Sequence, residues 1–212
     1  MPGTGSPVVT RYLNPAGGVL GSLLPVGAPV GPIEAPEGIV MASVVDAAHP
    51  YVFIRSADLD MTADGRSVAE LNGDAGFLAR IEQLRAAAAV AAGVAPDTAT
   101  ATASFPALPR IILVGPGNGG ADVTVTAFSM GKAHRALPMT GALCLGAAAA
   151  IDGTLVAAAA GGTRQNLRIR HPLGVTEVVA QVQAGSQIIR SLGVVRTARR
   201  LMDGRVYPRD YS

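Results

Sequence analysis

Several residue types are scarce in this sequence, and each shortage excludes a class of protein. The single cysteine, Cys144, excludes an internal disulfide and a cysteine-rich metal cluster, and it is typical of a reducing cytoplasm. Histidines occur only at positions 49, 134 and 171 and lack the spacing of zinc ligands, so we expect no metal. Tryptophan is absent and aromatic residues make up 4%. Small aliphatic side chains must therefore fill most of the core.

Charge is also scarce, at 15% of residues, whereas hydrophobic residues reach 49%. This balance indicates a globular protein with a substantial core rather than a disordered chain. The net charge is +2, and nine arginines but only three acidic residues follow position 160. Because these arginines have no aromatic residues interleaved between them, we expect a solvated face and no nucleic-acid partner.

A membrane partner is not expected either. Residues 141–162 are nearly uncharged and about as long as a membrane span, but they contain Asp152 and consist mainly of Ala and Gly. A helix, a turn and a strand explain this segment better. The start of the chain has no basic and apolar leader, so we expect a cytoplasmic protein.

Hydrophobic periodicity predicts an α+β fold with two main helices, at residues 76–93 and about 140–151. Residues 46–50 are expected to form a turn and residues 97–107 a surface loop, because Pro, Thr and Ala dominate there. Short connections favour antiparallel strands around the buried second helix. The strands are expected at 8–13 and 19–24, as a hairpin, and at 39–45, 51–54, 110–114, 121–128, 154–158, 166–171, 176–182 and 187–201.

Two short motifs match known signatures without their structural context. Residues 115–120 satisfy G-x-G-x-x-G, but a strand pattern follows them where a dinucleotide site needs a helix. Ser129 and Lys132 satisfy S-x-x-K, yet Gly131 and the preceding strand argue against a helix that would place Lys132 beside Ser129. We interpret the first as a glycine-rich turn and the second as a coincidence.

Basic side chains gather just before the second helix. Lys132, His134 and Arg135 lead to Thr140, which we expect to be the N-cap because Pro138 stops any earlier helix. The N–H groups of Thr140, Gly141 and Ala142, with the positive end of the helix dipole, would then bind an anion such as a carboxylate. Each residue taken singly is typical of a solvated charge or a packed histidine. Cys144 lies within the apolar helix and is expected to be buried and inert.

Seven stretches together resemble, in chain order, the PrpF-like isomerases, a family with a diaminopimelate epimerase-like fold. The family includes isomerases of 2-methylaconitate and methylitaconate and a tautomerase of oxalomesaconate. The matching stretches are PGTGSP (2–7), LNPAG (13–17), LLPVG (23–27), VDAAHP (45–50), GKAHRA (131–136), TGA (140–142) and RTARRLMDG (196–204).

The resemblance implies one complete domain plus strands of a second, because family members look longer and this chain resembles only their C-terminal part. Residues 1–45 would be the last strands of a first domain, 46–185 the second domain, and 186–212 strands that return to the first. The implied chemistry is cofactor-free proton transfer next to a double bond in a small unsaturated di- or tricarboxylate. The acid and base would lie outside this chain, which would contribute no catalytic residue and would bind substrate. Its substrate-binding residues would be His49, Lys132, His134, Arg135, Thr140, Gly141 and Ala142.

Two departures from the family pattern keep alternatives open. Where the family commonly has Asp-Ala-Gly-Asn-Pro, this chain has Ala48 and His49 in place of Gly and Asn. The position that holds a second catalytic cysteine in diaminopimelate epimerase is Pro138 here, which disfavours a racemase. The chain could also be a non-catalytic remnant that binds a carboxylate or a partner, and a homo-oligomer is possible.

Overall fold

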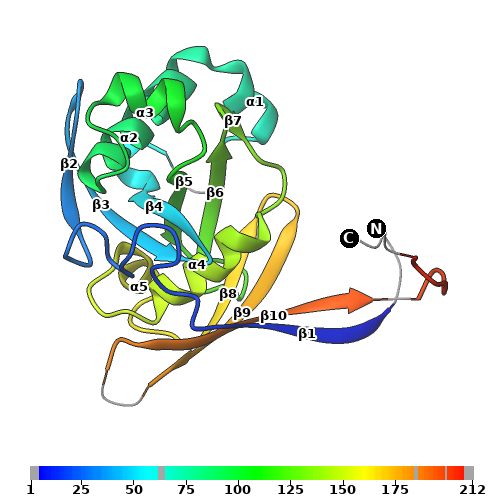
Figure 1. The fold of residues 1–212 in the computed structure, drawn as a ribbon. Helices are drawn as coiled ribbons and strands as arrows, with labels where there is room; N and C mark the ends of the chain where they lie inside the picture. The colour runs from blue at the N-terminus through cyan, green and yellow to red at the C-terminus, as the bar shows by residue number, and fades with distance from the viewer. Residues whose placement is uncertain (1–4, 62–64, 184–185, 199, 208–212) are drawn as a thin grey trace.

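The computed structural model describes residues 5–61, 65–183, 186–198 and 200–207. Its helices lie between the strands in two groups, one between β4 and β5 and the other between β7 and β8 (Figure 1). The elements in chain order are β1 (Ser6–Leu13), β2 (Gly31–Ala35), β3 (Gly38–Ala47), β4 (His49–Arg55), the 3-10 helix η1 (Ser56–Leu59), α1 (Val68–Gly73), α2 (Ala75–Ala91), α3 (Thr98–Ser104), β5 (Arg110–Pro116), β6 (Val123–Ser129), β7 (Lys132–Ala133), α4 (Met139–Ala149), α5 (Leu155–Ala159), β8 (Asn166–His171), β9 (Gly174–Val182) and β10 (Ile189–Ala198).

These strands form one sheet in the order β1-β10-β9-β8-β6-β5-β4-β3-β2, with β7 paired to β6. Neighbouring strands are antiparallel except for β4–β5 and β6–β8, which are parallel. The antiparallel prediction is wrong at these two pairs because helices connect them: α1 to α3 lie between β4 and β5, and α4 and α5 between β6 and β8. A crossover of that length brings the chain back in the same direction. The predicted α+β class is confirmed.

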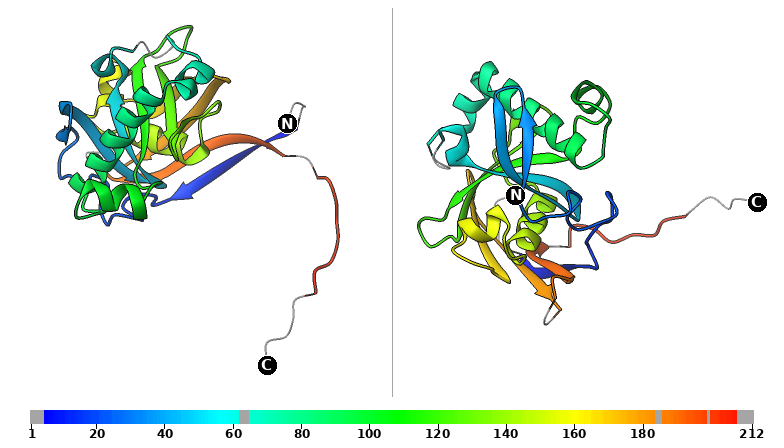
Figure 2. Two further views of the ribbon diagram at one scale, coloured as in Figure 1. Left: turned by 90° about the horizontal axis from the view of Figure 1, so that it is seen from above. Right: turned by 90° about the vertical axis from the view of Figure 1, so that its left-hand side faces the viewer.

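Helix α4 lies at the centre of the fold, and the sheet wraps around it (Figures 1 and 2). Every residue from Gly141 to Ala149 is buried, and α4 packs against β3, β4, β8, β9 and β10. Small side chains allow this close approach: a Cβ on Gly146 would lie 2.5 Å from Cγ1 of Val178. The absence of bulky aromatic residues in α4 is therefore what lets strands surround it.

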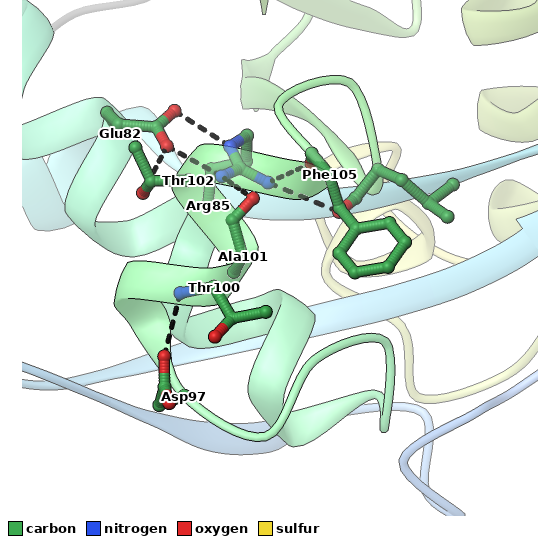
Figure 3. Close-up of polar contacts among 8 residues, drawn as sticks. Glu82, Arg85, Asp97, Thr100, Ala101, Thr102 and Phe105 are labelled. Carbon is green, nitrogen blue, oxygen red and sulfur yellow. Dashed lines mark hydrogen bonds and ion pairs between the residues drawn. The ribbon is translucent and has the colours of Figure 1, made fainter.

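Helices α1, α2 and α3 cover the opposite face of the sheet, where a second apolar core forms. The buried Arg85 of α2 joins these helices to the segment that leads into β5 (Figure 3). Its guanidinium donates to both carboxylate oxygens of Glu82, at 2.6 and 2.7 Å. It also donates to three main-chain carbonyl oxygens, those of Ala101, Phe105 and Leu108. This buried charge has partners on every side, as a charge in a core requires.

Three local predictions are wrong. Strand β1 pairs with β10 rather than with residues 19–24, which form turns and bends. Residues 97–107 contain α3, because the side chain of Asp97 caps its first turn. Residues 154–158 contain α5 instead of a strand, because Thr154 Oγ1 accepts a hydrogen bond from the Ala157 N–H at 3.1 Å. In both helices a capping side chain outweighs a sequence with weak helical periodicity.

Strands β1 and β10 leave the body of the molecule as a two-stranded arm (Figures 1 and 2). Their register runs from Ser6 opposite Ala198 to Leu13 opposite Ser191. The Tyr12 hydroxyl donates to Sδ of Met139 at 3.6 Å, which anchors the base of the arm beside the start of α4. The domain boundaries at residues 45 and 185 stay a prediction. Residues 2–4 of the first matching stretch, residue 199 of the last, and residues 208–212 lie outside the described residues.

Residues 141–162 fold as most of α4, a turn and α5. Within the described ranges, no helix has both the length and the hydropathy that a membrane crossing needs.

Candidate functional site

The basic turn between β6 and α4 is held by two neighbouring elements. Strand β7 pairs with β6, with Ala133 opposite Phe128 and Lys132 opposite Ser129. On its other edge, the side-chain amide of Asn72 from α1 accepts from the Ala133 N–H at 2.8 Å and donates to the Ala133 carbonyl at 3.1 Å. Asn72 thus makes the two hydrogen bonds that a further strand would make. Sequence reasoning missed it, since nothing local relates Asn72 to β7.

The three predicted basic residues lie in β7 and directly after it. Lys132 and Arg135 are exposed, whereas His134 is half-buried and its backbone N–H donates to the Ala127 carbonyl at 2.9 Å. Among the described residues, none of the three forms an ion pair with a carboxylate. The structure therefore keeps the positive charges of Lys132 and Arg135 uncompensated in a turn that leads directly to the start of α4.

The start of α4 differs from the prediction in two details. Pro138, with φ −58° and ψ 141°, is the N-cap, and Thr140 is the second residue of the helix. Proline serves here because its fixed φ suits a position just before a helix and its missing N–H would have no partner there. The Pro138 carbonyl accepts the Ala142 N–H at 2.9 Å. The Ala142 N–H is therefore not available to an anion, while Thr140 and Gly141 lie in the first turn, where N–H groups point out of the helix end.

Tyr51 connects the helix start to the sheet. Its ring is fully buried, and its hydroxyl lies 3.1 Å from Oγ1 of Thr140. Nη1 of Arg110 donates to the same hydroxyl at 3.4 Å, so the Tyr51 oxygen contacts both Arg110 and Thr140. A Cβ on Gly141 would lie 3.2 Å from the Tyr51 hydroxyl and 3.3 Å from Cδ1 of Ile112. Glycine at 141 thus allows Tyr51 to pack against the first turn of α4.

Arg110 is a second residue that sequence reasoning missed. It begins β5, pairs with Tyr51 in parallel register, and is partly buried. Its Nε is buried without a hydrogen-bond partner among the described residues. The signal available in the sequence was a lone charge at the start of the otherwise apolar run RIILVGP.

His49 belongs to the same cluster. Its Nε2–H donates to the Ala107 carbonyl at 3.2 Å, and its ring lies edge-on to Tyr51 with centroids 5.7 Å apart. Burial lowers the pKa of His49 below its ordinary value, Arg110 lowers it further, and the Ala107 carbonyl and Asp46 oppose the change. His49 is therefore neutral at neutral pH and holds the segment before β5 in place. Of the seven predicted residues, the structure places Thr140, Gly141 and His49 around Tyr51.

The connector before His49 is tighter than predicted. Strands β3 and β4 meet at Ala48 alone, which has φ 63°. The buried Asp46 accepts the N–H groups of Val19 and Leu20 through Oδ2, at 2.9 and 2.6 Å, so it ties the segment after β1 to the end of β3. The chain thus keeps a left-handed residue here although alanine replaces the glycine that is common in the family.

Cys144 and the glycine-rich residues 115–120 were the other candidates for a functional role. Cys144 is fully buried, its Sγ–H donates to the Val45 carbonyl at 3.3 Å, and burial raises the pKa of its thiol well above the usual range. Its predicted burial is confirmed, and its inertness stays a prediction. Residues 115–120 comprise the last two residues of β5 and a turn that leads toward β6 without a helix, which confirms the turn interpretation. Over the parts of the chain that the structure describes, no three His, Cys, Asp or Glu side chains lie where they could hold a metal.

Comparison with known proteins agrees with the resemblance seen in the sequence. The family model described as PrpF protein matches residues 1–209. The chain belongs to the PrpF family. Its relatives include a 3-methylitaconate isomerase from Eubacterium barkeri, 33% identical over 98% of this chain, and a 2-methyl-aconitate isomerase from Shewanella oneidensis, 36% identical over 93%. A (4E)-oxalomesaconate Delta-isomerase from Novosphingobium is 31% identical over 98% of the chain.

A solved structure supports the same membership. The crystal structure of a methylitaconate-delta-isomerase superposes on 97% of this PrpF family chain with a TM-score of 0.89 and 32% sequence identity. The predicted diaminopimelate epimerase-like fold is confirmed. This chain covers 58%, 54% and 56% of the three relatives above and 56% of the solved chain. It therefore spans little more than half the length of the proteins it matches.

Proposed function

We propose that this chain forms one wall of the active site of an isomerase that moves a proton in a small unsaturated di- or tricarboxylate. The observation that carries the proposal is the uncompensated positive charge of Lys132 and Arg135, with His134 between them, before α4. Carboxylates bind best where charged donors and helix N–H groups converge, and the first turn at Thr140 and Gly141 adds such donors. The relatives named above are isomerases of acids in this class.

In this proposal the residues of the chain bind and orient the substrate. Cations that hold its carboxylates stabilise the charge that develops when a proton leaves the carbon next to a conjugated carboxylate. Cys144 cannot serve as the base because it is buried and protonated. The proton-transferring groups are proposed to come from residues that correspond to the unmatched part of the relatives. The arm of β1 and β10, anchored at Met139, is proposed to join that part to the site.

The activity test follows the ultraviolet absorbance of the conjugated system in 2-methylaconitate, methylitaconate and 4-oxalomesaconate. The 212-residue chain and the product of the complete reading frame that contains it are both assayed. We expect the complete product to isomerise at least one of these acids, and the Lys132→Ala, Arg135→Ala double variant to raise its KM. Absence of turnover by the complete product with all three acids would contradict the proposal.

A further inference from the structure

We propose that Arg110 binds one carboxylate of the substrate and that Tyr51 holds its guanidinium in place. This inference rests on the proposed function and deepens it, because it names a specificity residue that neither the sequence nor the family resemblance indicated. Arg110 is held at the start of β5 by pairing with Tyr51, and it has no carboxylate partner among the described residues.

The position of Arg110 follows from the sheet. Tyr51 and Ile112 belong to the core that packs around α4, and alternate residues of a strand share a face, so Arg110 lies on that face too. The β5–β6 register pairs Ile111 with Phe128, which brings Arg110 opposite Ser129, and Ser129 in turn pairs with Lys132. Arg110 and Lys132 therefore lie two strands apart, where β5 begins and β6 ends, near the start of α4.

The hydrogen bonds of Arg110 differ from those of three other arginines that are at least partly buried, Arg66, Arg80 and Arg85. Arg66 and Arg85 each lie within 2.8 Å of a carboxylate oxygen, and Arg80 within 2.7 Å. Arg110 has no such partner among the described residues, and its bond to the Tyr51 hydroxyl is long, at 3.4 Å. Its buried Nε has none. Leaving a buried charged donor unsatisfied destabilises the folded state, and a ligand carboxylate that bound Nε would remove that cost.

The neighbours of Arg110 leave its guanidinium free to bind. The Tyr51 hydroxyl accepts a hydrogen bond from Nη1 of Arg110 and lies 3.1 Å from Oγ1 of Thr140, so it fixes one side of the fork. His49 is neutral at neutral pH, because burial lowers its pKa, and its Nε2–H is already used by the Ala107 carbonyl. Nε is buried in this structure, so a carboxylate that displaces the atoms covering it would pair with Nε and the remaining Nη in a bidentate contact beside the Thr140 turn. A second carboxylate of the same acid would then face Lys132.

The test measures binding of mesaconate, an unsaturated dicarboxylate, to the 212-residue chain by calorimetry and by the NMR signals of the His49 ring. We expect Arg110→Met to weaken mesaconate binding at least about tenfold, the loss typical of a charged hydrogen bond. Arg110→Lys keeps the charge but not the fork and should fall in between. Arg190→Met, at an exposed arginine on β10, is the matched control and should bind as the wild type does.

Two further readouts separate binding from a structural role. Because Arg110 lowers the pKa of His49, mesaconate should raise that pKa in the wild type and in Arg190→Met, but not further in Arg110→Met. The melting temperature of Arg110→Met should be unchanged or higher, since an unsatisfied charge is removed. If Arg110→Met does not fold, Arg110→Lys decides by the same binding measurement.

The outcomes distinguish this inference from the proposed function. Wild-type affinity in Arg110→Met, or no mesaconate binding by the wild-type chain, would overturn the role of Arg110. The ultraviolet assay of the complete product would still decide whether the protein is an isomerase. A loss of binding in Arg110→Met together with a large loss of stability and no change in the His49 pKa would also count against the inference.

Discussion

Replacing Gly141 or Gly146 of α4 by alanine should affect two properties differently, namely ligand binding and the free energy of unfolding. Gly141 lies in the first turn, where a Cβ would meet the Tyr51 hydroxyl at 3.2 Å and Ile112 at 3.3 Å. Gly146 lies further along, where a Cβ would lie 2.5 Å from Cγ1 of Val178. The first contact requires a shift of a few tenths of an ångström in the ring that positions Thr140 and Arg110. The second requires a buried, stiff side chain or its strand to move.

The sizes of the two effects follow from packing. Overfilling a core costs about 1–3 kcal/mol, and replacing glycine by alanine in a helix returns up to about 1 kcal/mol. The severe contact at Gly146 lies at the upper end, so Gly146→Ala should lose about 2 kcal/mol net. Gly141→Ala should come close to zero, because its contacts are milder. With about 2–4 °C per kcal/mol for a chain of this size, Gly146→Ala should melt roughly 4–8 °C lower than the wild type.

The two variants should rank in the opposite order when the loss of mesaconate affinity is measured. Gly141→Ala displaces Tyr51 and should weaken mesaconate binding several-fold, whereas Gly146→Ala leaves the helix start intact and should bind like the wild type when folded. Thermal unfolding followed by circular dichroism and calorimetric titration below the melting range give the two quantities. If Gly141→Ala melts as low as Gly146→Ala and binds mesaconate normally, then Gly141 matters only for packing and the role given to Tyr51 is refuted.

Four further predictions follow from single observations. Asn72→Ala removes both side-chain bonds to β7, so mesaconate should bind a few-fold more weakly and the amide of residue 133 should exchange faster in hydrogen exchange; unchanged exchange would contradict this. Cys144 should react with a thiol reagent only at the rate of unfolding, because it is buried and protonated, and rapid labelling of the native chain would refute that. Ala48→Gly should raise the free energy of unfolding by about 0.5–1 kcal/mol in urea, because relief of a left-handed alanine exceeds the entropy that glycine adds to the unfolded chain. Burial lowers the pKa of His49 and His171 below 6.5, so the unfolded chain binds more protons, and the free energy of unfolding should fall between about pH 7.5 and about pH 5.5; a flat profile would contradict the neutral state of both rings.

The parts of the fold that follow from local pattern were predicted well. Strand β8 has the predicted bounds, α2 differs by one or two residues at each end, and α4 begins one residue early. Long periodic or apolar runs carry their own signal, so distant contacts are not needed to recognise them. The partner of β1 could not be predicted, because β10 lies at the far end of the chain and an exposed strand carries no mark of its neighbour.

The candidate site was predicted only as far as it is local. Lys132, His134 and Arg135 stand next to the helix start in the sequence, so their place could be read directly. Tyr51 and Arg110 meet that helix only because β4 and β5 pair in parallel with a register that brings these two residues together. Register depends on the whole sheet, so a buried tyrosine and a lone arginine at a strand start gave no sign of belonging to one cluster.

The positive charge of Lys132, Arg110 and Arg135 favours a ligand with more than one carboxylate. Elsewhere on the surface basic and acidic side chains are interspersed, as where Arg55 lies beside Asp58 and Arg168 beside Glu177. Around the start of α4, Lys132, Arg110 and Arg135 have no carboxylate partner among the described residues, and the helix dipole adds to their repulsion. Such repulsion raises the free energy of the folded chain, and a ligand lowers it in proportion to the charge it brings. A single carboxylate would relieve only one of these contacts. An acid with two or three carboxylates on a short carbon frame relieves several at once, because the first carboxylate to bind places the others nearby without further loss of translational freedom.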